Sequence, residues 1–468
     1  MQNKSYDYPK FAVVGHPNKG KSSIVSSLSL DDSIQIGDTP GTTQVKRGFP
    51  LKVDGKIIYE LFDTPGFQRA RRVLAWLKKQ EPVSADKRTD VVRKFIAKHR
   101  DDPKFRDEIE LLEPIVDGAG IIYVVDASKP YGAEYETEME ILRWCGQPSM
   151  AILNLIGKED YREQWKSALG HYFRMVRTFN PIKATFDDHI SLLDSMSQLK
   201  EEWTKPIKIA IEVLESLHQE KIDLTVNTIV ENMQKTISFV YTYRIHGEKA
   251  NAKEEELAKV AYREAIVHYE KEQRKKIEAI WNHQSISKVE EGLILDDVGL
   301  FSNESASIFG LSEKELILTG ASAGAITGMG VDLLFAGSTF FTASLLGGLI
   351  GGVGAKFGFN NLYEVKLLGQ NIGKRELSVG PMKNLNFPYI LLGRALYHAS
   401  TISKRSHALR DSLHLNKEDF FMDQVMNSKL RKKLEELHVP LRKGKELKEE
   451  SLVQYKEVVL ESFIKLLK

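Results

Sequence analysis

Residues 1–200 alternate short apolar runs with segments of helical periodicity. The run at 120–126 carries a single charge, at its last position, as expected of a central strand in a parallel sheet that is covered on both faces. This order of strand, loop and helix predicts a doubly wound, mostly parallel α/β sheet. We expect its strands at residues 11–14, 56–62, 120–126, 149–156 and 175–179, and its helices at 23–30, 133–144 and 188–199.

An additional segment, at about residues 67–117, separates the second of these strands from the third and also has a helical pattern. Apolar residues recur in it at the spacing of one helix face. They form three groups, namely Val73, Leu74 and Leu77; Val92, Phe95 and Ile96; and Ile109, Leu112, Ile115 and Val116. We therefore expect a helical insert within a first domain that spans residues 1–200.

The second domain, residues 201–468, is expected to be mainly α-helical. Residues 203–281 read as nearly all helix, and the highly charged part at 248–279 is typical of a solvated helix face. We expect a short strand at 376–379, a helix at 389–403 and helices in the tail at 416–468. The apolar stripe of the first of these segments consists of Val226, Ile229, Val230, Met233, Ile237 and Val240.

Residues 316–355 differ from the rest of the chain because Asp332 is their only charge. Gly320, Gly324 and Gly328 recur at a spacing that lets helix backbones approach closely. The run at 333–355 would be about 34 Å long as a helix, enough to cross a hydrocarbon core. We expect a glycine-rich apolar helical hairpin. It either associates with a membrane, which we favour, or forms a buried helix pair.

The composition agrees with two or three folded domains in a reducing compartment. The 468 residues are 42% hydrophobic and 28% charged, which is typical of a folded chain, and a net charge of +2 makes no global case for nucleic-acid binding. Cys145 is the only cysteine, so no internal disulfide is expected, and residues 1–10 do not resemble a secretory signal. We expect a cytoplasmic protein, peripheral to or inserted in the inner membrane if the hairpin binds lipid.

The clearest chemistry follows the first predicted strand. Gly15-His16-Pro17-Asn18-Lys19-Gly20-Lys21-Ser22 matches the G-x-x-x-x-G-K-[ST] phosphate-binding loop, placed between a strand and a helix as that loop requires. Its backbone N–H groups can surround a polyphosphate, Lys21 can reach the β- and γ-phosphates, and Ser22 can bind Mg²⁺. The helix that begins at Ser23 adds the positive end of its dipole to this nucleotide-binding site.

Two further polar stretches complete the pattern of a nucleoside triphosphate site. The loop at 38–43 contains Thr42 and Thr43, and Asp63-Thr64-Pro65-Gly66 at a strand end fits the D-x-x-G pattern. In that pattern the aspartate holds Mg²⁺ through water and the glycine N–H contacts the γ-phosphate. A phosphate loop, a threonine that closes on the metal and an opposing aspartate are the parts that phosphoryl transfer requires.

These motifs resemble those of the TrmE–Era class of bacterial P-loop GTPases, whose loop often reads G-x-P-N-x-G-K-S and whose first switch carries a Thr-Thr pair. The resemblance implies binding of GTP and its hydrolysis to GDP and phosphate, with Mg²⁺ as cofactor, Thr43 as a metal ligand and Asn18 as a ligand of K⁺. Phe67 stands where Ras-like proteins have a water-positioning glutamine, so K⁺ bound by Asn18 could supply the missing positive charge. Gln68 is a weaker candidate for positioning the water. Lys21, Thr43 and Gly66 are then the catalytic candidates.

The guanine-recognition motif N-K-x-D is not matched cleanly. One register places its asparagine at Asn154 and leaves Leu155 and Gly157 at the lysine and aspartate positions, and another keeps Lys158 and Asp160 but loses the asparagine. We favour Asn154, because the strand then ends at a normal length. The aspartate matters because one carboxylate accepts both guanine N1–H and the exocyclic amine. Guanine preference is thus predicted less firmly than phosphate binding.

The layout also resembles a family of bacterial two-part GTPases whose C-terminal region has no known function. Besides the incomplete N-K-x-D, the resemblance rests on Asp297-Val298-Gly299-Leu300-Phe301, which is similar to a V-[DG]-L-F-like segment before the glycine-rich region of that family. Our interpretation is a nucleotide switch whose hairpin contacts a membrane. The helical insert either carries the γ-phosphate signal outward or caps the fold.

Two alternatives remain open. In the first, the hairpin is buried core and the basic tail contacts RNA during ribosome assembly, although acidic neighbours favour a solvated surface. In the second, the protein is structural and binds nucleotide with negligible hydrolysis. His398 and His407 lack metal-ligand spacing and are expected to be ordinary packing or surface residues. The basic residues of the tail are Lys429, Arg431, Lys432, Lys433, Arg442, Lys443 and Lys445.

Overall fold

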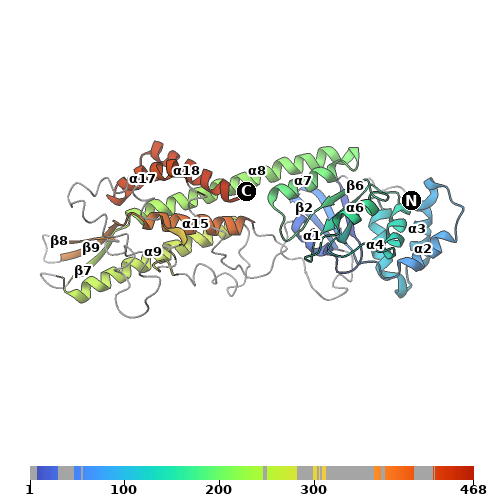
Figure 1. Cartoon of the computed structure of the whole chain (residues 1–468), viewed down its shortest axis with the longest axis horizontal. Coiled ribbons are helices and arrows are strands. Elements are labelled where there is room, and N and C mark those ends of the chain that lie inside the picture. The colour runs from blue at the N-terminus through green and yellow to red at the C-terminus, as the bar shows by residue number, and fades with distance from the viewer. Residues whose placement is uncertain are drawn as a thin grey trace. The chain divides into compact units, whose positions relative to one another are not determined.

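The computed structural model divides the chain into two compact units (Figure 1). The first comprises residues 1–217 with 405–410, and the second comprises residues 218–404 with 411–468. Thr42, Thr43 and the predicted hairpin at 316–355 lie outside the residues that the structure describes. The described residues are 8–29, 47–53, 56–245, 250–281, 299–302, 305, 308–311, 363–369, 375–404, 425 and 427–467.

A six-stranded sheet forms the centre of the first unit. Its strands are β1 (Lys10–Val14), β2 (Arg47–Val53), β3 (Lys56–Asp63), β4 (Gly120–Asp126), β5 (Ser149–Asn154) and β6 (Met175–Thr178), in the spatial order β2-β3-β1-β4-β5-β6. β2 runs antiparallel to β3 and all other neighbours are parallel, which confirms the predicted doubly wound, mostly parallel sheet. The sequence pattern does not predict β2, because its proline and charged residues resemble a loop; an edge strand tolerates both.

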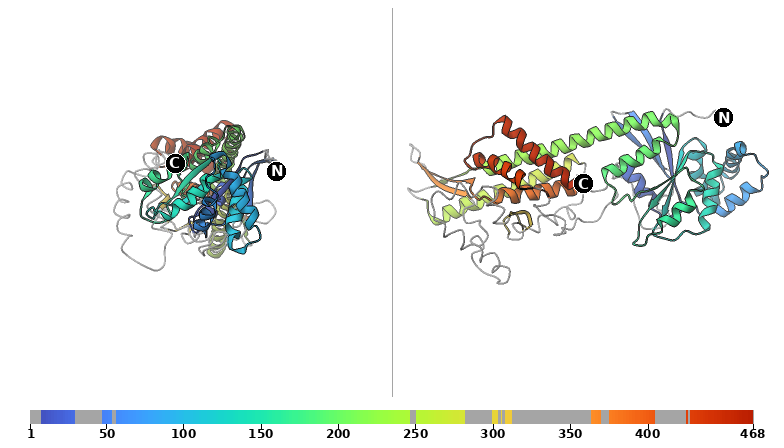
Figure 2. Two further views of the ribbon diagram at one scale, coloured as in Figure 1. Left: turned by 90° about the vertical axis from the view of Figure 1, so that its right-hand side faces the viewer. Right: turned by 45° about the horizontal axis from the view of Figure 1, so that its top comes forward.

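Helices cover both faces of this sheet (Figures 1 and 2). They are α1 (Lys21–Ser29), α2 (Ala70–Lys78), α3 (Arg88–His99), α4 (Arg106–Val116), α5 (Glu134–Trp144), α6 (Arg162–Leu169), α7 (Phe186–Ser197) and the first part of α8 (Glu201–Ser238). Successive strand residues point to opposite faces, so each strand supplies two cores. Val14 and Val125 belong to the core with α2 to α6, whereas Val13 and Val124 belong to the core with α1, α7 and α8.

The insert between β3 and β4 is helical, as predicted, and consists of α2, α3 and α4. Among the residues of its three apolar groups, Leu74 is half-buried and all the others are buried. Phe67, at the start of the insert, belongs to the same core as α2 to α6. The insert is therefore packed onto one face of the sheet.

The strand order places a switch point at β1, which lies between β3 and β4. In open sheets of this class, ligands bind outside the carboxyl ends of the strands at such a point. The strands β1, β3, β4 and β5 end at this edge with Val14, Asp63, Asp126 and Asn154. The sheet thus presents two aspartates and one asparagine beside the loop that follows β1.

The second unit is helix-rich, as predicted, and also holds a three-stranded antiparallel sheet. Its helices are the rest of α8, α9 (Ala252–Ile280), α15 (Phe387–Lys404), α17 (Ser428–Arg442) and α18 (Glu449–Leu467). Its strands are β7 (Tyr241–Ile245), β8 (Tyr363–Gly369) and β9 (Arg375–Met382), in the order β7-β9-β8. The expectation of nearly continuous helix over 203–281 is therefore wrong at β7. Val240, assigned to the apolar stripe, lies past the end of α8 and is 41% exposed.

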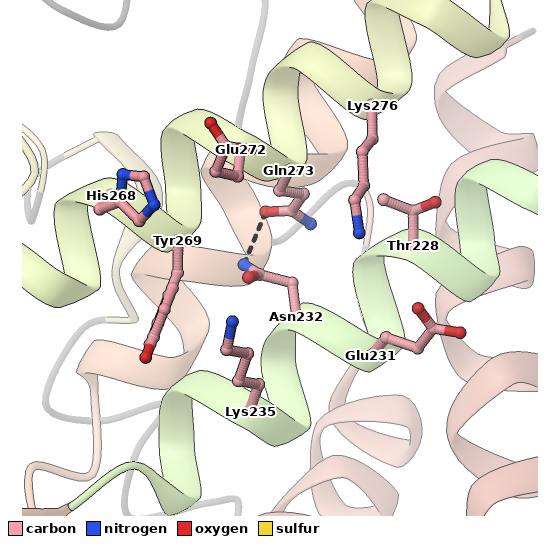
Figure 3. A pocket seen from close by; sticks show the side chains of 9 residues that line it. All are labelled: Thr228, Glu231, Asn232, Lys235, His268, Tyr269, Glu272, Gln273 and Lys276. Atoms are coloured by element: carbon pink, nitrogen blue, oxygen red, sulfur yellow. Dashed lines mark hydrogen bonds between the residues drawn. The ribbon is translucent and has the colours of Figure 1, made fainter.

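Polar contacts join the long helices of the second unit. Asn232 Nδ2 on α8 donates to Gln273 Oε1 on α9 at 2.9 Å, and the pair lies in a pocket of about 300 Å³ (Figure 3). The buried Arg394 on α15 donates from Nε to Glu270 Oε1 on α9 at 2.5 Å. Because an arginine is almost never fully buried without a partner, this pair supplies the charge that Arg394 needs and joins α15 to α9.

The tail differs from the predicted solvated basic face at two positions. Arg431 and Arg442 are buried, and Arg442 donates to the buried carboxylate of Glu435. The other five basic residues of the predicted set are exposed. His398 is half-buried and its Nε2 lies 3.0 Å from Glu278 Oε1, a packing role, whereas His407 lies outside the described residues. Among the described residues, no helix is long and apolar enough to cross a membrane.

Candidate functional site

The loop after β1 has two positions at which the backbone conformation and the close neighbours require glycine. Gly15 has φ of +142° and a Cβ there would lie 2.4 Å from the carbonyl oxygen of Val124, on β4. Gly20 has φ of +87° and a Cβ there would lie 2.3 Å from Asn154 Nδ2. Asn18 has φ of +59°, a left-handed conformation that asparagine tolerates better than most residues. The loop is thus pressed between the ends of β4 and β5.

Lys21 begins α1 and its ammonium is turned back over the loop. Its Nζ donates to the backbone carbonyl of His16 at 3.1 Å, so the loop wraps around the lysine side chain. Burial lowers the pKa of Lys21 to about 8, and the nearby Asp63 carboxylate opposes that shift. An ammonium has three donors, so this group can also contact phosphate oxygens within the loop.

The D-x-x-G segment contacts the loop at two points. Ser22 Oγ donates to Asp63 Oδ2 at 2.7 Å, and Asp63 is buried at the end of β3. Gly66 lies against Pro17, because a Cβ at Gly66 would come within 2.7 Å of the Pro17 nitrogen. A serine hydroxyl beside an aspartate carboxylate supplies the hard oxygen ligands that Mg²⁺ prefers, so these residues fit that ion. Ser23, next in α1, is half-buried.

Asn154 joins the end of β5 to the phosphate loop. Its Nδ2 donates to the backbone carbonyl of Lys19 at 3.1 Å. The side chain of Lys19 is buried, with Nζ 3.8 Å from Asp126 Oδ2. Burial lowers the pKa of Lys19, and the Asp126 carboxylate opposes that shift. Ser128 N and Oγ donate to Asp126 Oδ1 at 3.0 and 2.5 Å, so this aspartate organises the end of β4.

The sequence alone does not identify Asp126 or Glu138 as neighbours of the loop. Glu138, on α5, is buried; its Oε1 lies 2.9 Å from His16 Nδ1, and its Oε2 accepts from Tyr123 Oη at 2.9 Å. A charge at the end of an otherwise apolar strand is the signal that could have identified Asp126. Glu138 has no such signal, because an acidic residue within a polar helix resembles a solvated one.

Neither register of the guanine motif brings a free carboxylate to the end of β5. In the Asn154 register Gly157 takes the aspartate position, and a Cβ there would lie 2.8 Å from Ser128 Oγ. In the other register Asp160 is already bound, since Arg162 donates to its two oxygens from Nε at 2.9 Å and Nη2 at 2.6 Å. The side-chain carboxylate expected for guanine is thus missing or occupied at these positions.

The residues after Gly66 are held by the insert. Phe67 is 2% exposed and packs in the core, so it offers no group to an attacking water. The side chain of Gln68 is exposed, and its backbone N–H donates to Glu108 Oε1 on α4 at 3.0 Å. The backbone N–H of Arg69 donates to the same oxygen. Burial raises the pKa of Glu108.

Comparison with known proteins assigns both parts of the chain. Residues 10–155 match the family model described as 50S ribosome-binding GTPase, and residues 166–460 match that described as Domain of unknown function (DUF3482). The GTPase Der of Agathobacter rectalis is 36% identical over 94 residues, which are 19% of this chain and 21% of that protein. The GTPase Der of Caldanaerobacter subterraneus subsp. tengcongensis is 28% identical over 208 residues, 42% of this chain and 40% of that protein.

The chain therefore spans less than half the length of these curated relatives. Among solved structures, Aquifex aeolicus Era bound to GDP·AlF4⁻ aligns over 59% of this chain and 90% of its own, with 13% identity and a TM-score of 0.28. Because the DUF3482 model alone covers more than half of the residues, this chain belongs to the DUF3482 family, and its first unit is a P-loop GTPase domain.

Proposed function

We propose that the protein is a switch that binds GTP and hydrolyses it to GDP and phosphate at the carboxyl edge of the first sheet. The observation that carries this proposal is the hydrogen bond of 2.7 Å between Ser22 Oγ and Asp63 Oδ2. It joins the phosphate loop to the D-x-x-G segment beside Lys21, in the arrangement that phosphoryl transfer requires. The GTPase family model over residues 10–155 supports guanosine as the nucleoside.

In this proposal the chain positions the triphosphate for in-line attack by water. Lys21 and the loop N–H groups stabilise the charge on the phosphates, and the N–H of Gly66 contacts the γ-phosphate. Ser22 and Thr43 would bind Mg²⁺ directly, and Asp63 would bind it through water. When bound, Mg²⁺ neutralises charge on the β- and γ-phosphate oxygens. Phe67 takes no part, because its ring is buried in the core.

We assign K⁺ assistance to Asn18. Its left-handed backbone places an exposed side chain at the tip of the phosphate loop, where an amide oxygen can bind a cation beside the phosphates. Potassium would add positive charge at a site whose position 67 lacks a glutamine. Turnover in K⁺ should exceed turnover in Na⁺ at equal ionic strength, and Asn18→Ala should remove the difference. Equal rates in the two salts would refute this role.

Hydrolysis is tested with Lys21→Ala, and Lys87→Ala is the matched control because Lys87 is exposed on the insert. Removing one charge that stabilises the transition state costs on the order of 10²-fold in rate. We expect that loss for Lys21→Ala and none for the control, measured as phosphate release from GTP and from ATP with Mg²⁺. Retained activity in Lys21→Ala would overturn the site. Negligible turnover in the wild type would favour the structural, nucleotide-binding alternative.

For the cellular role we propose membrane association through residues 316–355. The support is the sequence: Asp332 is the only charge there, and glycines recur at helix-contact spacing. Sodium carbonate extraction of membranes tests it with GDP and with a non-hydrolysable GTP analogue. Complete release of the protein in every nucleotide state would exclude insertion.

A ribosomal role is the second candidate, and the description of the matching family model as 50S ribosome-binding GTPase favours it. Lys429, Lys432 and Lys433 are exposed on α17, and Lys443 and Lys445 are exposed just after it. RNA binding that weakens steeply with salt, and that is lost when these five lysines become glutamine, would support this role over membrane association.

A further inference from the structure

Glu108 is a buried carboxylate that binds the backbone just beyond the D-x-x-G segment. It lies on α4 of the helical insert and is 0% exposed. Its Oε1 accepts from the N–H groups of both Gln68 and Arg69, two and three residues after Gly66. One carboxylate oxygen thus fixes two successive peptide groups of the chain that leaves the nucleotide site.

The insert holds this short segment at two further points. The guanidinium of Arg69 donates to the backbone carbonyl of Lys104, just before α4. Phe67 is buried in the core that α2, α3 and α4 share. Phe67, Gln68 and Arg69 are therefore all anchored in the insert, whereas Gly66 lies against Pro17 of the phosphate loop. A shift of Gly66 towards a γ-phosphate must move these anchors or break them.

Packing alone does not explain a carboxylate at this position. Glutamates are almost never fully buried without partners, and burial raises the pKa of Glu108 because it penalises the charged form. Glu108 Oε2 has no hydrogen-bond partner among the described residues, so only one of its two oxygens is used. An apolar side chain would fill the space at lower cost. A buried acceptor that fixes two N–H groups instead sets the position of residues 68 and 69.

We propose that Glu108 is the positioning residue through which the helical insert holds the second switch, which is the D-x-x-G segment and the residues just after it (63–69), and senses the γ-phosphate. This inference rests on the proposed GTPase function and assigns the insert a part in it. With GDP bound, Glu108 holds residues 68 and 69 against α4. With GTP bound, the N–H of Gly66 is drawn to the γ-phosphate, and the hydrogen bonds to Glu108 transmit that movement to α4.

The experiment compares Glu108→Ala and Glu108→Gln with Glu113→Gln, a partly exposed glutamate of the same helix that pairs with Arg100. Hydrogen exchange of α4 peptides is measured with GDP and with a non-hydrolysable GTP analogue, together with single-turnover hydrolysis. In the wild type and in Glu113→Gln we expect α4 exchange to differ between the two nucleotides. In Glu108→Ala the difference should vanish and hydrolysis should fall about 10²-fold, because the switch is no longer positioned, while GDP affinity is kept.

Glu108→Gln keeps an acceptor without the charge, so it should fold and restore part of the α4 response and of the rate. That rescue separates positioning from simple loss of packing. The inference is overturned if Glu108→Ala keeps the wild-type α4 response, or if the wild type shows no such response while hydrolysing GTP. A wild type that neither binds nor hydrolyses GTP would instead overturn the proposed function, and the inference with it.

Discussion

Ser22 Oγ donates to Asp63 Oδ2 at 2.7 Å, which joins the start of α1 to the end of β3. The two residues are 41 positions apart in sequence, so only the parallel pairing of β1 with β3 brings them together. Both oxygens are of the kind that Mg²⁺ binds. The hydrogen bond therefore marks where the metal would lie, between the phosphate loop and the D-x-x-G segment.

This geometry predicts a contrast between two substitutions at Ser22. Ser22→Ala removes the hydroxyl that would bind Mg²⁺, whereas Ser22→Thr keeps it, as the [ST] position of the motif allows. We expect Ser22→Ala to lose Mg²⁺-dependent GTP turnover by on the order of 10²-fold and Ser22→Thr to stay within a few-fold of wild type. The measurement is the rate against Mg²⁺ concentration. A Mg²⁺ response in Ser22→Ala equal to that of wild type would remove Ser22 from the metal site.

The contact between Gly66 and Pro17 predicts that the second switch tolerates no side chain at position 66. A Cβ there would lie 2.7 Å from the Pro17 nitrogen, so close that the backbone of Gly66 or of Pro17 would have to shift. We expect Gly66→Ala to weaken binding of a non-hydrolysable GTP analogue at least about tenfold and to keep GDP affinity, because only the triphosphate needs the Gly66 N–H.

Gly299→Ala is the control for that substitution, since a Cβ at Gly299 would meet no atom within 4 Å. Isothermal titration with each nucleotide gives the two affinities. If Gly66→Ala weakened GDP and the triphosphate analogue equally, Gly66 would have a general role in the loop rather than a γ-phosphate role.

The phosphate site was predictable because its chemistry is local in sequence. Eight consecutive residues specify the loop, and the positive φ of Gly20 follows from a turn that its motif already implies. The doubly wound, mostly parallel sheet followed from the alternation of strands and helices, whereas the spatial order of its strands was not predicted. β2 and β7 were not predicted, because both mix polar with apolar residues. β7 is fixed by the pairing of Tyr241 with the distant Val379.

The acidic residues around the site were not predictable from periodicity. α4 carries Glu108, Glu110 and Glu113, and nothing in their spacing shows that Glu108 is the buried one. Its partners, the N–H groups of Gln68 and Arg69, belong to the backbone and leave no trace in the sequence. Side-chain motifs are thus readable from the sequence, whereas buried acceptors of backbone groups are found only once the chain is folded.

Because neither register brings a free carboxylate to the end of β5, we expect the site to discriminate weakly between guanine and adenine. An added carboxylate should strengthen that discrimination. Gly157→Asp would place a carboxylate at the aspartate position of the Asn154 register, where it could accept the N1–H and amine of guanine. A hydrogen bond to a charged group contributes about 1.5–3 kcal/mol, or roughly 10- to 150-fold. We expect the GTP-to-ATP affinity ratio to rise by at least about tenfold in Gly157→Asp. Ser128 must shift slightly, because the new Cβ would lie 2.8 Å from its Oγ.

Gly157→Asn is the matched control for base recognition, because it has the same shape without the charge. Competition by GTP, ITP and ATP measures the preference, and ITP reports on the amine alone. An unchanged ratio in Gly157→Asp would mean that the base does not lie at this end of β5. An equal gain in both variants would show that shape rather than the carboxylate selects guanine.

The buried His438 predicts acid sensitivity of the second unit. His438 lies on α17, its Nε2 is 2.8 Å from Tyr455 Oη on α18, and its ring packs against Tyr389 of α15. Burial, and then the nearby Arg442 guanidinium, lower the pKa of His438 well below its usual value. The folded state therefore binds the proton less readily than the unfolded state, so stability is fully present above the unfolded pKa of about 6.5 and is lost as the pH falls towards the folded pKa.

The expected slope is at most about 1.4 kcal/mol of unfolding free energy per pH unit for this one proton. His438→Gln can still reach Tyr455. In this variant, the hydrogen-exchange protection of α17 and α18, expressed as a free energy, should depend less steeply on pH, by up to that amount. A smaller slope should persist, since burial also lowers the pKa of His398. Hydrogen exchange of these two helices between about pH 7.5 and 5.5 measures the effect, with exposed His268→Gln as the control. If His438→Gln and His268→Gln gave the same pH profile as the wild type, His438 would not be the group that titrates on unfolding.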